Sequence, residues 1–209
     1  MGKQSWTFLS YLFHPVVMPT LGTLAVLWCD PNLYIPLNTE KPWLIVLGIV
    51  FFCTCLLPLS ASWALLLLGR ISSVSHPTES DRRFMLSFTA LFFILIYYVF
   101  HNIPAIGESL KIFMLGINIS IVITLITSLF TPVSFHTVGV GGLLGTIIGL
   151  MKYTQQCLFL WLVIAFIIVV LASLSRYKLK AHGAFEIYLG LIIGITFQSL
   201  VFFFRIHGA

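Results

Sequence analysis

Long apolar stretches alternate with short polar ones along the whole chain. Seven stretches are long enough, or nearly so, to form the roughly 20-residue apolar helix that crosses a bilayer. They cover residues 8–28, 43–69, 84–103, 108–130, 136–151, 156–174 and 184–204. The number falls to six if the first stretch lies partly in the membrane interface. The pattern predicts an all-α fold, a polytopic transmembrane helix bundle with six to seven spans.

Composition points to the same fold. Hydrophobic residues make up 59% of the 209 residues and charged residues 8%, whereas soluble domains carry about 25% charged residues. There is too little charge to cover a water-exposed surface, so lipid is the solvent that fits. Because the loops are short, we expect a single integral membrane domain over residues 1–209.

The net charge of +5 does not indicate a nucleic-acid partner, because the basic residues are scattered among the apolar stretches. Phospholipid headgroups or an anionic membrane substrate are the better partners for such a distribution. The four cysteines do not have the spacing of a zinc site. We therefore expect neither a metal nor another cofactor.

The predicted spans place the loops at 70–83, 131–135 and 175–183 on one face of the membrane, together with the N-terminus. This face gathers most of the histidines and arginines, and ionisable groups at membrane depth tend to mark function. The residues concerned are His14, His76, Arg82, Arg83, His136, Arg176, His182 and Glu186.

The most informative stretch is residues 175–190, SRYKLKAHGAFEIYLG. On a helix, His182 and Glu186 lie one turn apart on the same side. A carboxylate there can accept a hydrogen bond from one imidazole nitrogen and leave the other as a nucleophile.

The spacing Ser175-Arg176, five residues, His182, three residues, Glu186 resembles the third motif of the type-2 phosphatidic acid phosphatases, which carry aspartate as the acid. Ser134 and His136 match two residues of the second motif, Pro-Ser-Gly-His. The first motif is Lys, six residues, Arg-Pro. Arg82 or Arg83 could supply its arginine, whereas His76 and Phe84 stand where lysine and proline are expected after aligning on Arg83. The chain looks like a divergent bacterial member, with peripheral spans in residues 1–75 and a phosphatase-like core in residues 76–209.

This resemblance implies a metal-independent hydrolase that removes phosphate from a membrane lipid phosphate or diphosphate. His182 would be the nucleophile that forms a phosphohistidine, Glu186 would orient it, and His136 would act as general acid and base. The residues implied in phosphate binding are Arg176, Arg83, Arg82 and Ser134, with His76 and His14 as accessory residues.

Two other functions stay open at this point. The chain could be a catalytically silent relative that binds anionic lipid, or a small membrane transporter, which would need ionisable residues at mid-membrane depth. The resemblance favours an outward-facing site in a bacterial inner (cytoplasmic) membrane. The lysine and arginine counts of the two faces become equal once the phosphate ligands are set aside, so they do not fix the side. A homo-oligomer is compatible with the sequence.

Overall fold

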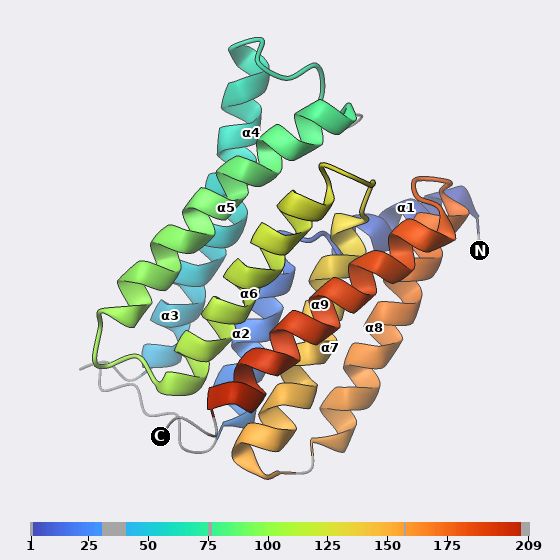
Figure 1. Ribbon diagram of the computed structural model, residues 1–209. Helices are drawn as coiled ribbons and strands as arrows, with labels where there is room; N and C mark the ends of the chain where they lie inside the picture. The colour runs from blue at the N-terminus through green and yellow to red at the C-terminus, as the bar shows by residue number, and fades with distance from the viewer. Residues whose placement is uncertain (1, 31–40, 75–76, 157, 206–209) are drawn as a thin grey trace.

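The structure, a computed structural model, describes residues 2–30, 41–74, 77–156 and 158–205, and these residues form helices and connecting loops with no strand. Within these described ranges, six helical segments are long and apolar enough to cross a membrane, and they run side by side in one bundle (Figure 1). They are Pro42–Leu67, Glu79–His101, Glu108–Thr127, Phe135–Thr154, Phe159–Lys178 and Ala184–Phe204. The predicted all-α bundle is confirmed, and the chain is an integral membrane protein.

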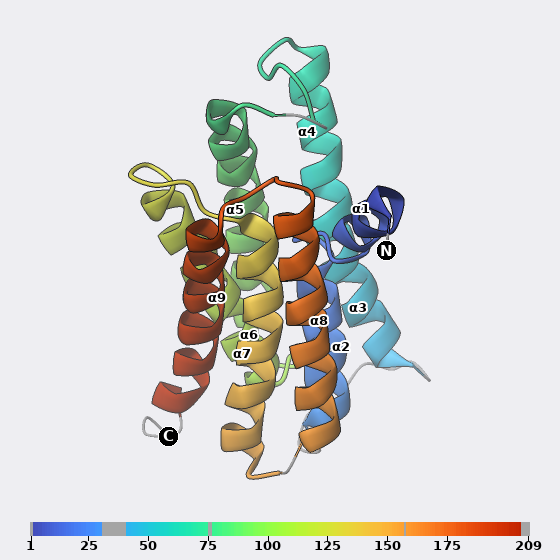
Figure 2. The same ribbon diagram turned by 90° about the vertical axis from the view of Figure 1, so that its right-hand side faces the viewer.

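The first predicted span, residues 8–28, is wrong as a single helix. It consists of two short helices, α1 (Lys3–Leu12) and α2 (Met18–Cys29). Pro15 has no backbone N–H, its ring would clash with the carbonyl four residues earlier, and it disfavours a helical conformation at the residue before it. As a result α1 lies at an angle to the bundle, as Figure 2 shows, and the structure supports the alternative of six spans.

The next span contains a proline and absorbs it without breaking. It is built from α3 (Pro42–Phe51), a π-helical turn η1 (Phe52–Leu56) and α4 (Leu57–Leu67). Pro58 cannot donate to the carbonyl of Thr54 and would clash with it in a regular α-helix. The wider π turn just before Pro58 accommodates this local mismatch.

Helix α5 (Glu79–His101) begins at Glu79 rather than at the predicted residue 84. The reason is a capping box, in which the Asp81 backbone N–H donates to Thr78 Oγ1 at 3.1 Å and the Thr78 N–H donates to Asp81 Oδ2 at 3.1 Å. Arg82 and Arg83 therefore stand in the first turns of a helix, which fixes their directions relative to each other.

The remaining helices are α6 (Glu108–Thr127), α7 (Phe135–Thr154), α8 (Phe159–Lys178) and α9 (Ala184–Arg205). Helices α7 and α9 touch along glycines, as expected from the glycine-rich sequence of α7. A Cβ atom added to Gly145 would lie 2.6 Å from the carbonyl oxygen of Ile195, and one added to Gly149 would lie 2.5 Å from the ring of Phe202. The close contact extends to the starts of the helices, where a Cβ atom added to Gly190 would lie 2.7 Å from the carbonyl oxygen of Ser134.

Two buried amides tie α6 to its neighbours in the apolar middle of the bundle. Asn118 Nδ2 donates to the carbonyl of Phe93 in α5 at 3.1 Å, and also to its own helix at Met114. Gln198 Nε2 in α9 donates to the carbonyl of Phe113 at 3.1 Å. These neutral side chains join helices within the membrane-spanning region.

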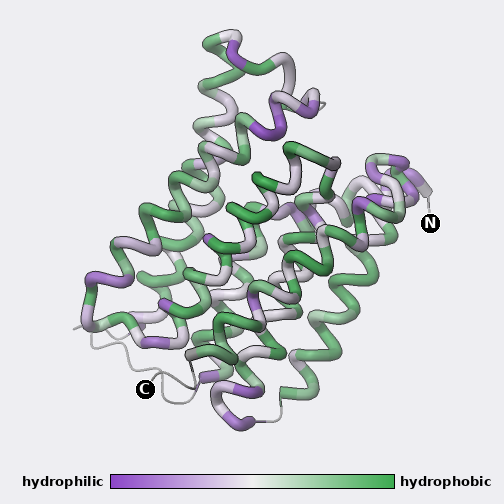
Figure 3. The backbone as a smooth tube through the Cα atoms, viewed as in Figure 1, coloured by the Kyte–Doolittle hydropathy of each residue, from purple (hydrophilic) through white to green (hydrophobic). Residues whose placement is uncertain are grey.

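Hydrophilic segments gather mainly at the two ends of the bundle, with hydrophobic helix between them (Figure 3). Helix α1 and the α4–α5, α6–α7 and α8–α9 connections all lie toward the upper end in Figure 1. This is the grouping that the order of the spans predicts. It brings the start of α7, the end of α8 and the start of α9 to the same end as α1.

Candidate functional site

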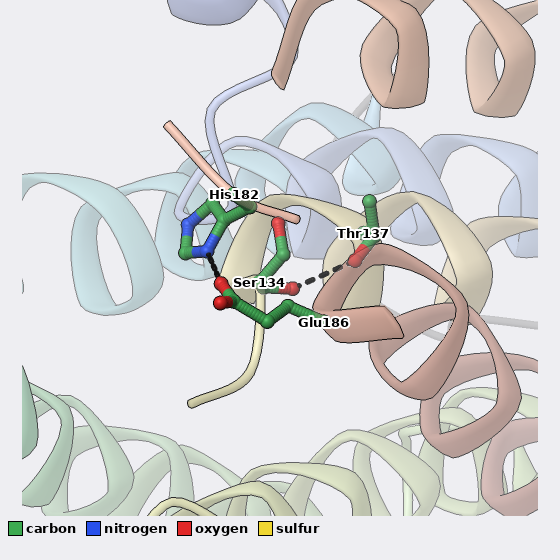
Figure 4. Close-up of polar contacts among 4 residues, drawn as sticks. All are labelled: Ser134, Thr137, His182 and Glu186. Carbon is green, nitrogen blue, oxygen red and sulfur yellow. Dashed lines mark hydrogen bonds and ion pairs between the residues drawn. The ribbon is translucent and has the colours of Figure 1, made fainter. Parts of the chain in front are cut away.

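The His182–Glu186 pair is formed as the sequence spacing predicts. His182 lies in the short connection between α8 and α9, and Glu186 lies in the first turn of α9. His182 Nδ1 and Glu186 Oε2 are 2.5 Å apart (Figure 4). Because an ionised carboxylate only accepts hydrogen bonds, Nδ1 carries the proton and the lone pair of a neutral His182 is on Nε2.

His182 is buried, and its surroundings favour the neutral ring. Burial is the main cause that lowers the pKa of His182 below 6.5, and the nearby Arg176 and Arg82 lower it further. The hydrogen bond and the charge of Glu186 act in the opposite direction. The imidazole is therefore mostly neutral near pH 7, which is the form that can act as a nucleophile.

Ser134 is fully buried directly before α7 and beside this pair. Its backbone N–H donates to the carbonyl oxygen of Glu186 at 3.3 Å, which fastens the start of α7 to the first turn of α9. Its own carbonyl accepts from Thr137 Oγ1 at 2.9 Å. A serine at this position usually caps the helix with its hydroxyl, but Ser134 makes no such bond, and its Oγ has no hydrogen-bond partner among the described residues. Figure 4 shows that the Ser134 hydroxyl points toward the side where His182 lies, away from the carbonyl that accepts from Thr137.

Two arginines from different helices bring positive charge to the pair. Arg176, in the last turn of α8, is close enough to His182 to interact with it electrostatically, and so is Arg82 from α5. Arg176 and Arg82 also affect each other. The Nε atom of each is buried without a hydrogen-bond partner in the part of the chain that the structure describes.

Arg83 lies differently from Arg82, a distinction that the sequence did not provide. Arg83 Nη1 donates to the carbonyl of Ser128 at the end of α6, at 3.4 Å. Both arginines line a shallow depression together with Pro132 and Val133. Arg82 is thus the arginine of α5 that interacts electrostatically with His182 and Arg176, whereas Arg83 connects α5 to the end of α6.

His136, in the first turn of α7, contacts a residue that the sequence interpretation missed. Its Nε2 lies 3.2 Å from the carbonyl oxygen of Ser10 in α1 and 3.5 Å from the Ser10 hydroxyl. The same hydroxyl accepts a hydrogen bond of 2.8 Å from Arg176 Nη1. No sequence signal singles out Ser10, which is one of two serines in the short helix α1.

His14 follows α1 and adds a second imidazole beside His136. The two ring centroids are 5.2 Å apart in an edge-to-face arrangement. Burial, and then the charge of Arg176, lowers the pKa of His14, so that this ring is also mostly neutral near pH 7. The other predicted accessory residue, His76, lies outside the described residues.

The cluster formed by His182, Glu186, Arg176, Arg82 and His136 carries more positive than negative charge. It contains two guanidinium groups and one carboxylate, and partly buried arginines are costly unless an anion or hydrogen-bond acceptors surround them. Guanidinium groups bind the oxygens of phosphate or carboxylate through pairs of N–H donors. The cluster is therefore suited to a small oxyanion next to an imidazole.

Comparisons of the chain with protein-family models, curated protein sequences and solved structures give no match. The fold and the side chains together define an all-α integral membrane protein with a histidine–arginine–glutamate cluster at one end of its helix bundle.

Proposed function

We propose that this protein is a membrane phosphatase that hydrolyses a lipid phosphate or diphosphate through a phosphohistidine intermediate. The observation that carries the proposal is the position of His182: Glu186 binds its Nδ1, its Nε2 holds the lone pair, and two arginines lie within electrostatic range. A nucleophile and a group that orients it, next to donors for an oxyanion, are the parts that phosphoryl transfer needs.

In the first step, Nε2 of His182 attacks phosphorus and the bond from phosphorus to the lipid oxygen breaks. His136 enters this step as the doubly protonated imidazolium and gives one proton to the leaving oxygen, while Arg176 and Arg82 bind the phosphoryl oxygens. Glu186 balances the positive charge of the modified ring. In the second step, His136 takes a proton from water, the hydroxide attacks phosphorus, and phosphate leaves as His182 is restored.

The substrate would be an amphiphile, because the cluster lies at one end of membrane-spanning helices. A lipid can move sideways in its leaflet until its headgroup reaches the arginines, with its chains still in the hydrocarbon layer. As part of the same proposal, we place the protein in the inner membrane of a bacterium, in line with the family that its motifs resemble.

A catalytically silent relative that binds anionic lipid would differ from the phosphatase only in turnover, so an assay of phosphate release distinguishes the two. The transporter alternative gains little from the fold, since Asn118 and Gln198, the amides in the apolar middle of the bundle, bind helix carbonyls. A transporter would be expected to carry ionisable residues at that depth.

The test uses the full chain purified in detergent and a panel of lipid phosphates and diphosphates, with phosphate release measured in the presence of a chelator. We expect turnover with the chelator, because no group of three or more His, Cys, Asp or Glu side chains in the described ranges is arranged so that it could hold a metal ion. His182→Ala should abolish turnover and the acid-labile phosphoenzyme. His101→Ala, at the opposite end of α5, is the matched control and should retain both.

Full activity of His182→Ala in a clean preparation would refute the mechanism. Binding of lipid phosphates without hydrolysis by the wild type would favour the silent relative. Activity lost with the chelator and restored by magnesium would refute the metal-independent reaction.

A further inference from the structure

Ser10 connects two residues of the cluster that come from separate helices. Its hydroxyl accepts from Arg176 Nη1 of α8 at 2.8 Å, and its carbonyl lies 3.2 Å from His136 Nε2 of α7. The residue is 8% exposed, although it belongs to the short N-terminal helix. Both contacts therefore cross from α1 to the end of the bundle where the cluster lies.

Helix α1 turns this serine inward and large apolar side chains outward. Phe8, Tyr11 and Leu12 are 66%, 69% and 49% exposed. This is the reverse of an amphipathic helix on a water-soluble protein, and it suits a helix whose outer side meets lipid. The inward position of Ser10 follows from the same orientation, and it leaves the serine within reach of α7 and α8.

The carbonyl of Ser10 also determines which nitrogen of His136 can exchange a proton. A carbonyl oxygen only accepts, so His136 Nε2 carries the hydrogen that it donates to Ser10. In the neutral ring, Nδ1 then holds the lone pair. Nδ1 is therefore the atom that can gain a proton from water and, in the protonated ring, give one to a leaving oxygen.

Resting on the proposed function, we propose that Ser10 is a positioning residue of the phosphoryl-transfer site. Its hydroxyl holds one N–H of Arg176, so that the guanidinium presents its remaining donors to the phosphoryl oxygens in a fixed direction. Its carbonyl selects the His136 tautomer with the free lone pair on Nδ1. The N-terminal helix thus completes a site whose chemistry comes from the later helices.

The hydroxyl can be tested separately from the backbone. Ser10→Ala removes the acceptor for Arg176 and leaves the carbonyl in place. Ser10→Thr keeps the hydroxyl and is the rescuing variant. Thr7→Val is the matched control, because the Thr7 hydroxyl lies on the same helix and donates to the Lys3 carbonyl at 3.0 Å.

Binding of orthovanadate, an analogue of the transferred phosphoryl group, gives a readout that does not depend on turnover. Titration calorimetry in detergent should show vanadate bound about 10-fold more weakly by Ser10→Ala, the size expected when a hydrogen bond to a charged group is lost. Thr7→Val should bind as the wild type does, and Ser10→Thr should restore most of the affinity. On a lipid phosphate substrate, kcat/KM should fall by a similar factor.

A double-mutant cycle with Arg176→Ala distinguishes positioning from a general packing effect. If Ser10 acts through Arg176, Ser10→Ala should have little further effect on vanadate binding once Arg176 is replaced, so the two changes are not additive. Additive effects would overturn the proposal. Should Ser10→Ala fail to fold, Ser10→Cys keeps nearly the same volume with a weak acceptor and should weaken binding in the same direction.

Three further results would overturn the role of Ser10: unchanged vanadate affinity in Ser10→Ala, an equal loss in Thr7→Val, or no vanadate binding by the wild type. Failure of the proposed function looks different. In that case the wild type binds vanadate, Ser10→Ala binds it more weakly, and lipid phosphates are not hydrolysed.

Discussion

Replacing Glu186 with glutamine tests how the carboxylate supports His182. Glutamine keeps the size of the side chain and removes its charge, at a position one helical turn from the nucleophile. The amide oxygen can still accept from Nδ1, but it no longer balances the positive charge that His182 gains when it becomes phosphorylated. The predicted defect is therefore one of rate and not of folding.

The size of the defect follows from the geometry. The contact is short, at 2.5 Å, with the His182 side chain 5% exposed and that of Glu186 25% exposed. A hydrogen bond to a charged group contributes about 1.5–3 kcal/mol, and the solvent that reaches Glu186 places this bond near the lower end, at about 1.5–2 kcal/mol. We expect Glu186→Gln to lower kcat/KM by about 10- to 30-fold.

The pH dependence of kcat/KM gives a second, independent test of the role of Glu186. The neutral His182 is the nucleophile, so kcat/KM falls as pH drops through the pKa of this residue in the free enzyme. Burial holds that pKa below 6.5, and Glu186 raises it again in part. Removing the charge of Glu186 takes away the raising contribution, so the acidic limb of Glu186→Gln should lie at lower pH than that of the wild type.

The assay is phosphate release from one lipid phosphate, measured as kcat/KM across the acidic range with thermal melting as a check on folding. Glu108→Gln, at the start of α6 and at the other end of the bundle, is the control and should match the wild type. Glu186→Asp keeps the charge and should keep activity. An acidic limb that moves to higher pH, or a rate unchanged in Glu186→Gln, would refute the role given to this carboxylate.

Two other predictions concern the packing of α7 and its histidine. Gly145→Ala should lower the free energy of unfolding by about 1–3 kcal/mol, because its Cβ would lie 2.6 Å from the Ile195 carbonyl oxygen. Gly142→Ala is the control and should not lower it, because the space at its Cβ is open. Equal losses of melting temperature for the two variants in detergent would contradict the α7–α9 contact. His136→Ala should slow hydrolysis of lipid monophosphates by about 10²–10⁴-fold and should slow hydrolysis of aryl phosphates much less, because their leaving group needs no proton. His101→Ala is the control. Equal losses on both substrates would contradict the role of His136 as proton donor.

The helix bundle was predictable from sequence because apolar length is the main requirement for crossing a membrane. The errors arose where local backbone chemistry decides a boundary. Pro15 divides the first apolar stretch into α1 and α2, and the Thr78–Asp81 capping box starts α5 at Glu79. Both signals are present in the sequence, but neither appears in a count of apolar residues.

The site was predictable in part for a similar reason. His182 and Glu186 are one helical turn apart, so their contact follows from local geometry alone. The choice between Arg82 and Arg83 depends on how α5 faces α6 and α8, which is set by tertiary packing. Ser10 lies 126 residues from His136 in sequence, and no local pattern predicts a contact over that separation.

The charges of the cluster restrict the kinds of ligand that the proposed site would bind. Arg176 and Arg82 supply two positive charges, and Glu186 supplies one negative charge that His182 already uses through its hydrogen bond. A neutral headgroup would leave two partly buried guanidinium groups without an added anion, and the cluster would keep its excess positive charge. A phosphate monoester or diphosphate brings the missing negative charge and oxygens that match the guanidinium donors. This is why an anionic lipid phosphate fits the cluster better than a zwitterionic lipid, in which a bound ammonium group would be repelled by the same arginines.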